Sequence, residues 1–230
     1  MTNSLVLTFD LDWCADDVLE YLLDKLIKNN ISATFFVTHE TPLLEKIREY
    51  DFFELGIHPN FNDNSSHGSN FKEVIDYCLN IVPGAISCRP HGLMVSSNKL
   101  IYMMKKGIQI DCSIFMPNVA TLENFDLSVN EYKILRVPYN WEDDYEFYQQ
   151  HKKYKFKDIQ NFKNKILDFH PIHVYLNSDS EKQYEMYKAN IKFTKNMGIG
   201  TETMLDDTIK EHLKGNIQIM NLKEYVGRIK

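Results

Sequence analysis

Short apolar runs alternate along the chain with segments whose apolar residues recur every three or four positions. The run over 5–9 is almost wholly apolar and leads directly into acids, which is typical of a strand buried on both faces. Over 16–28 the apolar residues fall on one helical face, and Asn29 and Asn30 would end that helix. By the same criteria, strands are predicted over 32–37, 52–57, 85–89, 107–113, 132–137 and 165–169, helices over 43–48, 71–79, 97–106 and 180–196, and two shorter elements near the end.

This alternation of strands and helices indicates parallel βαβ units. At least six such units in one chain suit either a barrel or an open doubly wound sheet. The sequence has no linker rich in Pro, Gly or Ser, no internal repeat and no low-complexity tract. We therefore expect one α/β domain over residues 1–230, a length sufficient for a single large core.

Composition and charge narrow the possible functions. Hydrophobic residues make up 43% of the chain and charged residues 25%, as in ordinary globular proteins, and the net charge is −6. No basic face is evident, because the lysines over 152–157 alternate with aromatic residues beside acids, so a nucleic-acid partner is not expected. No apolar run approaches the roughly 18 residues of a membrane span.

The amino-terminal residues and the cysteines suggest a compartment. The chain begins without a charged, leader-like segment, and its four cysteines (Cys14, Cys78, Cys88 and Cys112) are far apart with no CxxC pair. Both features favour free thiols and a cytoplasmic protein.

Several common chemistries lack their motifs. The sequence contains no GxGxxG, no GxxxxGK[ST] and no GxSxG, and it has only nine glycines. No cysteine stands beside an obvious base. A dinucleotide site, a phosphate-binding loop, a serine hydrolase and a thiol nucleophile are therefore not expected.

The predicted strand ends carry a more coherent set of residues. Chemistry in parallel α/β folds gathers at the carboxyl ends of the strands. Carboxylates, imidazoles and a few aromatic or basic residues stand at or just beyond these ends: Asp10, Asp12, His58, Arg89, His91, Asp111, Tyr139, Trp141, Asp143, Asp144, His170 and His173. Such a rim can hold a divalent cation through a carboxylate oxygen and neutral histidine nitrogens, and it leaves other groups for acid–base chemistry.

Each of these residues also has a structural interpretation. Asp12 could cap the following helix, and a single histidine at a strand end is more often a hydrogen-bonded core residue than a ligand. Arg89 could be an ion-pair partner, and Trp141 could belong to the core. The functional interpretation therefore depends on the whole set.

The order of these residues resembles a known family. Thr8-Phe9-Asp10-x-Asp12, Gly56-Ile57-His58, Arg89-Pro90, Asp111 and a late strand ending in His170 are similar to the polysaccharide deacetylases of the NodB-homology group, carbohydrate esterase family 4. Asp-Leu-Asp-Trp at 10–13 and Phe-His-Pro-Ile-His at 169–173 resemble the WbmS-like branch most closely. The resemblance covers about residues 4–177.

This resemblance implies a distorted (β/α)7 barrel of the NodB-homology type. It also implies one divalent metal ion, zinc in the first place and cobalt, nickel, iron or manganese as alternatives, held by one Asp and two His. Carried over by position, Asp12 and His58 match metal ligands, Asp10 the general base, Arg89 its partner and His170 the general acid. Asp10 and Asp12 could exchange roles, because residues two apart on a strand face the same side.

The second histidine ligand departs from the family pattern. Its usual position, four residues after His58, is Asn62 here, and we expect His67 to replace it, with Asn62 as the alternative. The turn Arg89-Pro90-His91-Gly92 also differs from the family's Arg-x-Pro-Tyr. His173 competes with His170 for the acid role. The residues expected to contact substrate are His91, Tyr139, Trp141, Asp111 and His173.

Two functions follow from these expectations. The first is a metal-dependent hydrolase that removes an N-acyl group, acetyl or formyl, from an amino sugar or sugar-nucleotide precursor in surface-polysaccharide biosynthesis. The second is an inactive deacetylase-like barrel that binds carbohydrate or serves as a scaffold, favoured by Asn62 in place of histidine. The expected partner is a small molecule, and a homo-oligomer stays open beside a monomer.

Overall fold

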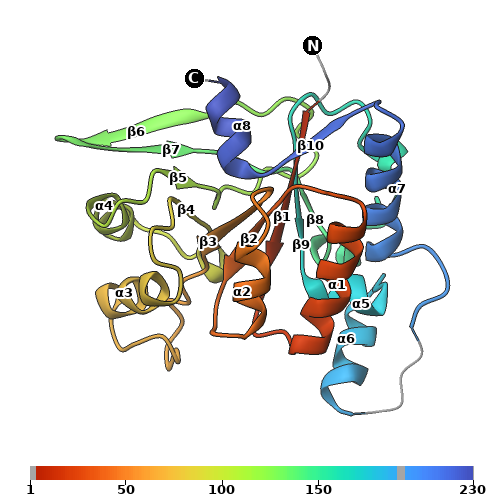
Figure 1. Cartoon of the computed structure of the whole chain (residues 1–230), viewed down its shortest axis with the longest axis horizontal. Helices are drawn as coiled ribbons and strands as arrows, with labels where there is room; N and C mark the ends of the chain where they lie inside the picture. Colours follow the sequence, from red (N-terminus) through yellow and green to blue (C-terminus); the bar gives the residue numbers. More distant parts are fainter. Residues whose placement is uncertain (1–3, 191–194, 230) are drawn as a thin grey trace.

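The computed structural model describes residues 4–190 and 195–229, and its organising element is one mixed sheet (Figure 1). Strand β1 lies within this sheet, and from its second residue onward every side chain is buried, as its unbroken apolar run requires. The ten strands are β1 (Ser4–Asp10), β2 (Ala33–Val37), β3 (Phe53–Ile57), β4 (Ser87–Cys88), β5 (Ile110–Asp111), β6 (Phe125–Val129), β7 (Tyr132–Arg136), β8 (Trp141–Glu142), β9 (Lys165–Phe169) and β10 (Gln218–Met220).

The strand order explains how distant residues meet. The sheet runs β6-β7-β5-β4-β3-β2-β1-β9-β8, and β10 pairs with the first half of β1. All pairs are parallel except the β6–β7 hairpin, which projects from one edge in Figure 1. The carboxyl ends of β1, β3, β4 and β9 therefore open on one side. The predicted α/β fold class is confirmed, as a distorted, partly open barrel whose sheet runs from β6 at one edge to β8 at the other.

Helices cover the sheet where their apolar faces predict. Helix α1 (Asp16–Lys28) buries five apolar side chains, and Figure 1 shows it beside α5 (Pro171–Leu176) and α7 (Thr201–Leu213). The remaining helices are α2 (Leu43–Arg48), α3 (Phe71–Ile81), α4 (Ser97–Lys105), α6 (Glu181–Lys188), α8 (Leu222–Ile229) and the short 3-10 turns η1 (His91–Leu93), η2 (Tyr145–Tyr148) and η3 (Phe156–Asp158). In the described part of the chain, no helix has both the length and the apolar character needed to cross a membrane. The four cysteines are free thiols, as expected.

The predicted elements match well where patterns are strong. The helices over 16–28 and 43–48 and the strand over 165–169 have the predicted bounds. The strands predicted over 85–89 and 107–113 shrink to β4 and β5, of two residues each. The residues predicted as strand on either side of β4 and β5 lie in loops instead.

The second half of the chain departs most from the prediction. Strand β6 was not predicted, although Phe125, Leu127 and Val129 alternate with Asp126 and Ser128; it lies at the edge of the sheet, paired with β7, and its side chains are exposed or half-buried. The helix predicted over 180–196 ends at Lys188, and residues 191–194 lie outside the described residues. Three elements close the chain where two shorter ones were predicted: α7 of 13 residues, β10 of three and α8 of eight.

Candidate metal centre and acid–base site

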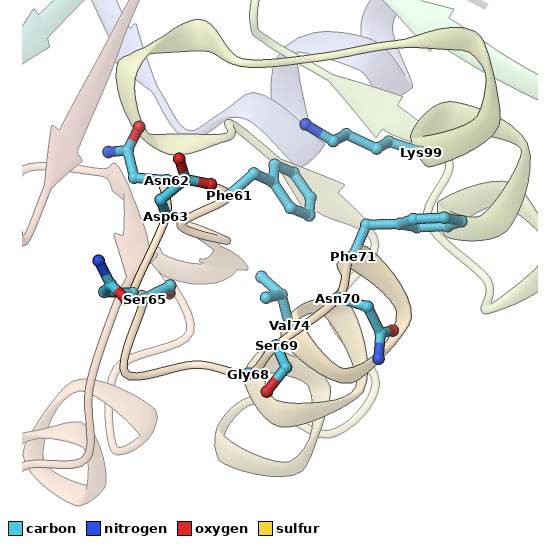
Figure 2. A pocket seen from close by; sticks show the side chains of 11 residues that line it. Phe61, Asn62, Asp63, Ser65, Gly68, Ser69, Asn70, Phe71, Val74 and Lys99 are labelled. Carbon is cyan, nitrogen blue, oxygen red and sulfur yellow. The ribbon is translucent and has the colours of Figure 1, made fainter.

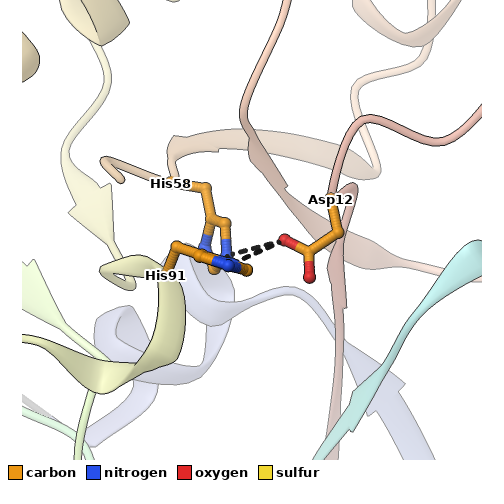
Figure 3. Close-up of side chains that lie close together, drawn as sticks. All are labelled: Asp12, His58 and His91. Carbon is orange, nitrogen blue, oxygen red and sulfur yellow. Dashed lines mark hydrogen bonds and ion pairs between the residues drawn. The ribbon is translucent and has the colours of Figure 1, made fainter. Parts of the chain in front are cut away.

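Asp12 lies in an unusual turn at the end of the first strand. Asp12 and Trp13 have φ angles of 41° and 54°, in the left-handed region that residues other than glycine seldom adopt. The Trp13 N–H donates to the Thr38 Oγ1 at 3.1 Å and helps to fix this backbone. The turn presents the Asp12 carboxylate to His58 and His91 (Figure 3). Such local strain is often kept where a side chain must be aimed.

His58 and His91 reach Asp12 from neighbouring strands. His58 directly follows β3, and His91 begins η1 after β4. The backbone N–H of His91 donates to the Pro59 carbonyl at 3.0 Å. The Asp12 Oδ1 lies 3.1 Å from His58 Nε2 and 3.0 Å from His91 Nδ1. The two nitrogens are 3.3 Å apart (Figure 3). One carboxylate oxygen and two imidazole nitrogens therefore form a compact triangle.

This triangle fits a divalent cation. A four-coordinate ion with ligands at about 2.0–2.2 Å separates neighbouring ligand atoms by about 3.3–3.5 Å. The sides of the triangle, 3.0–3.3 Å, are close to that spacing. Burial would raise the pKa of Asp12, but hydrogen bonds with His58 and His91 hold it well below its ordinary value. The carboxylate is thus ionised, as a metal ligand must be.

The structure places His91, and not His67, in this group. His67 Nδ1 accepts a hydrogen bond from the Asn60 N–H at 3.1 Å, and its ring stacks on Tyr77. The Trp13 ring lies against both His67 and His91, with centroids 5.4 Å from each. Here His67 therefore contacts the loop after β3 and Tyr77, and it is not in the group formed by Asp12, His58 and His91.

Asn62, the alternative ligand, lies elsewhere as well. It lines a separate cavity of about 370 Å³ whose walls come from the 61–74 segment and Lys99 (Figure 2). The histidine that lies together with Asp12 and His58 is His91. This weakens the argument that Asn62 marks the loss of a histidine ligand.

Asp10 and Arg89 form a buried pair beside the triangle. Arg89 Nη1 donates to Asp10 Oδ1 at 2.9 Å and also to Asp168, and no part of Arg89 is exposed. Its guanidinium lies between the rings of Phe36 and Tyr139, at 4.7 and 4.4 Å. Burial would lower the pKa of Arg89, but Asp10 and Asp168 raise it well above its ordinary value. Asp10 is thereby fixed with Oδ2 3.6 Å from His58 Nε2.

His170 lies on the other side of Asp12. Its Nδ1 is 2.7 Å from Asp143 Oδ1, its N–H donates to Asp143 Oδ2 at 2.8 Å, and its Nε2 is 3.5 Å from Asp12 Oδ2. Burial would lower the pKa of His170, but the Asp143 carboxylate raises it well above its ordinary value. Because Nδ1 is held by Asp143, the Nε2 proton is the one free to be transferred.

Two acidic residues in this network lacked an assigned role in the sequence. Asp168 stands two residues before His170 on β9, so strand alternation could have placed both on one face. Asp143 follows β8, and its meeting with His170 depends on the pairing of β8 with β9. The sequence placed Asp143 near the rim but gave no sign of its partner.

Three expected substrate contacts are buried in the scaffold instead. Tyr139 is wholly buried, with its hydroxyl on Glu142 at 3.1 Å. Trp141 is 1% exposed, and its Nε1 donates to the Lys153 carbonyl at 2.8 Å. Asp111 is fully buried and bonded to Arg136 and to Ser113. In this arrangement the polar atoms of all three are bonded within the protein.

The burial of Trp141 leads to a stability prediction. Trp141→Ala removes a ring packed on Phe169 and Tyr154, and large-to-small changes of this kind cost about 3–5 kcal/mol. We expect urea denaturation to show a loss of this size, while Trp141→Phe keeps most of the stability and any substrate KM of the parent protein. A higher KM with unchanged stability would return Trp141 to the substrate site.

His173, unlike the three expected substrate contacts that are buried in the scaffold, lines a cavity. It is 6% exposed, lies one helical turn after His170, and lines a cavity of about 260 Å³ together with Asp12 and His170. Its Nδ1 is 3.4 Å from Ser178 Oγ. Burial lowers the pKa of His173 well below its ordinary value, so the ring is neutral. A neutral imidazole here can bond to a substrate without adding charge.

Comparison with known proteins identifies the family to which the chain belongs. A family described as "WbmS-like: Polysaccharide deacetylase" matches residues 7–188. The chain belongs to this family of polysaccharide deacetylases. No curated protein matches the chain.

Among solved structures, one of high similarity is a protein of Bordetella bronchiseptica described as a polysaccharide deacetylase involved in O-antigen biosynthesis. It is 33% identical, with 91% of each chain covered and a TM-score of 0.80. A family 4 carbohydrate esterase from Bacillus anthracis is 14% identical, with 98% and 83% covered and a TM-score of 0.54. A family 4 pseudoenzyme from the same organism is 13% identical, with 97% and 65% covered and a TM-score of 0.52. The two distant matches bear on the fold alone.

Proposed function

We propose that this protein is a metal-dependent deacylase that removes an acetyl or formyl group from the nitrogen of an amino sugar used in surface-polysaccharide biosynthesis. The observation that carries the proposal is the triangle of Asp12, His58 and His91, with an acid–base group on either side. The O-antigen role described for the Bordetella relative supports the biosynthetic context. Action on small precursors in the cytoplasm is part of the proposal.

Asp12, His58 and His91 would hold the metal ion. When bound, a divalent cation supplies Lewis-acid polarisation of an acyl carbonyl and lowers the pKa of water. Two neutral imidazoles and one carboxylate are a donor set suited to zinc and to related metals. The presence of His91 in this corner also weakens the alternative of an inactive scaffold, which rested on Asn62.

The flanking residues would divide the proton transfers. Asp10, held by Arg89, accepts the proton of the attacking water, and His170 donates its Nε2 proton to the departing amine nitrogen. Asp143 holds the His170 ring in the orientation that leaves Nε2 free. Water and amide are thus converted to a carboxylic acid and an amine with all protons accounted for.

The role of Asp10 can be separated from that of the ligands. Asp10→Asn keeps the shape of the side chain and one oxygen for Arg89, but it cannot take a proton. We expect turnover to fall by about 10²–10⁴-fold while the metal content stays that of the parent protein. Elemental analysis and acetate-release assays on the same preparation measure both. Loss of metal together with turnover would instead make Asp10 a ligand.

A further inference from the structure

The cavity beside His170 has a lining that bears on substrate choice. Its volume is about 260 Å³, and it shares Asp12 and His170 with the candidate centre. Pockets that hold whole drug-sized ligands usually measure about 300–1,000 Å³. The cavity therefore suits one sugar ring better than a ligand with several linked parts.

One wall of this cavity is aromatic. The His173 ring makes edge contacts with Phe147 and Tyr184, with centroids 4.9 and 5.4 Å away. These side chains come from α5, η2 and α6, so three separate elements build the wall. Aromatic walls with a few polar groups are typical of small-molecule sites. The Lys188 ammonium lies 4.9 Å from the centre of the Tyr184 ring, so this surface already accommodates a cation.

The remaining lining is mostly acidic. Asp144, Glu181 and Glu185 line the cavity beyond the candidate centre, where Lys188 is the one basic side chain, while His170 on the side of the centre is the other group that carries positive charge. Lys188 is paired with Glu185 at 3.1 Å, so its charge is largely balanced. Recognition of phosphate or carboxylate normally uses arginine, lysine or a helix N-terminus free of acids. Glu181 begins α6 and works against that use.

We propose that the cavity between η2 and α6 binds a single sugar ring whose substituents are neutral or carry an amine, and that it disfavours sugars bearing phosphate, diphosphate or carboxylate groups. This inference rests on the proposed function and refines it, because it selects amino sugars over sugar nucleotides. The amine released by deacylation is cationic and suits the same acidic wall.

The test compares three forms of each sugar, which differ in charge. N-acetylated gluco-, galacto- and mannosamine are each supplied as the neutral sugar, the 1-phosphate and the uridine diphosphate ester to the metal-loaded protein. We expect kcat/KM for the preferred neutral sugar to exceed that of its charged forms at least tenfold at low salt. Glu181 and Glu185 are exposed, so salt screens their charges. The ratio of kcat/KM between neutral and charged sugars should therefore shrink as the Debye length falls from about 30 Å at 0.01 M to about 8 Å at 0.15 M salt.

Two double variants test whether Glu181 and Glu185 cause the preference for neutral sugars. Glu181→Gln/Glu185→Gln should reduce the neutral-to-phosphate ratio severalfold, without changing metal content. Glu20→Gln/Glu45→Gln removes the same charge from the exposed surfaces of α1 and α2 and should leave the ratio unchanged. If both double variants lowered the neutral-to-phosphate ratio equally, the net charge of the protein, and not the cavity, would determine the preference. That result would overturn the inference.

Binding of the deacylated sugars gives a readout that needs no turnover. Ligand-observed NMR should show the free amino sugar bound more tightly than its 1-phosphate. If phosphates bind or react as well as neutral sugars, or if none of the sugars binds, the inference is overturned. If the free amines bind with the expected preference but no acyl group is released from any N-acetyl or N-formyl sugar, the proposed function fails instead.

Discussion

Replacing His91 with alanine is expected to remove the metal ion and nearly all deacylase activity, whereas His67→Ala is expected to keep both. His91 Nδ1 is 3.0 Å from Asp12 Oδ1, while His67 Nδ1 is occupied by the Asn60 N–H. Loss of partners that only orient ligands commonly costs 10–100-fold in metal affinity. Loss of a ligand atom itself should therefore weaken binding by more than about 100-fold.

Metal titration of the stripped protein, followed by calorimetry, measures this difference directly. His67→Ala serves as the matched control, because it also removes an imidazole from the same region. That variant should lower the melting temperature, since it removes the stack on Tyr77 and the support of the loop after β3. The opposite result, with metal lost in His67→Ala and kept in His91→Ala, would restore the ligand set expected from the sequence.

The choice between these two histidines shows where sequence reasoning stops. Strong periodicity was enough to predict α1, α2 and β9, and strand ends were enough to gather Asp10, Asp12 and His58 at one rim. The identity of the third ligand depends on loop paths. The left-handed backbone of Gly92, with φ of 59°, and the bond to the Pro59 carbonyl bring His91 inward.

The buried scaffold around Arg89 shows a second limit. Tyr139 and Trp141 were expected at the substrate because they follow a strand that ends near the rim. Trp141 is a core residue because β8 continues the sheet beside β9, and Tyr139 is one because its backbone bridges to Phe115; neither pairing has a local signal. The pairing of β8 with β9 also brings Asp143 to His170. Long-range strand register thus decides which rim residues face the substrate and which face the core.

His170→Ala is expected to lower kcat by about 10²–10⁴-fold with the metal retained, and Asp143→Asn is expected to shift the pH dependence. Burial opposes the charge on His170, but Asp143 raises the pKa of this imidazole well above its ordinary value. An acid acts only while protonated, so activity should fall as pH rises through the pKa of His170. Removing the charge at 143 lowers that pKa and moves the basic limb of the kcat profile to lower pH.

The neighbouring histidine supplies the control for this assignment. His173 lines the same cavity but is neutral, because burial lowers its pKa well below the ordinary value. His173→Ala should therefore raise KM more than it lowers kcat and leave the basic limb in place. Kinetics from pH 6 to 10 on metal-loaded His170→Ala, His173→Ala and Asp143→Asn separate the two roles. A basic limb that disappears in His173→Ala, with near-normal turnover in His170→Ala, would make His173 the acid. The bond between Asp143 and His170 would then only anchor the start of α5.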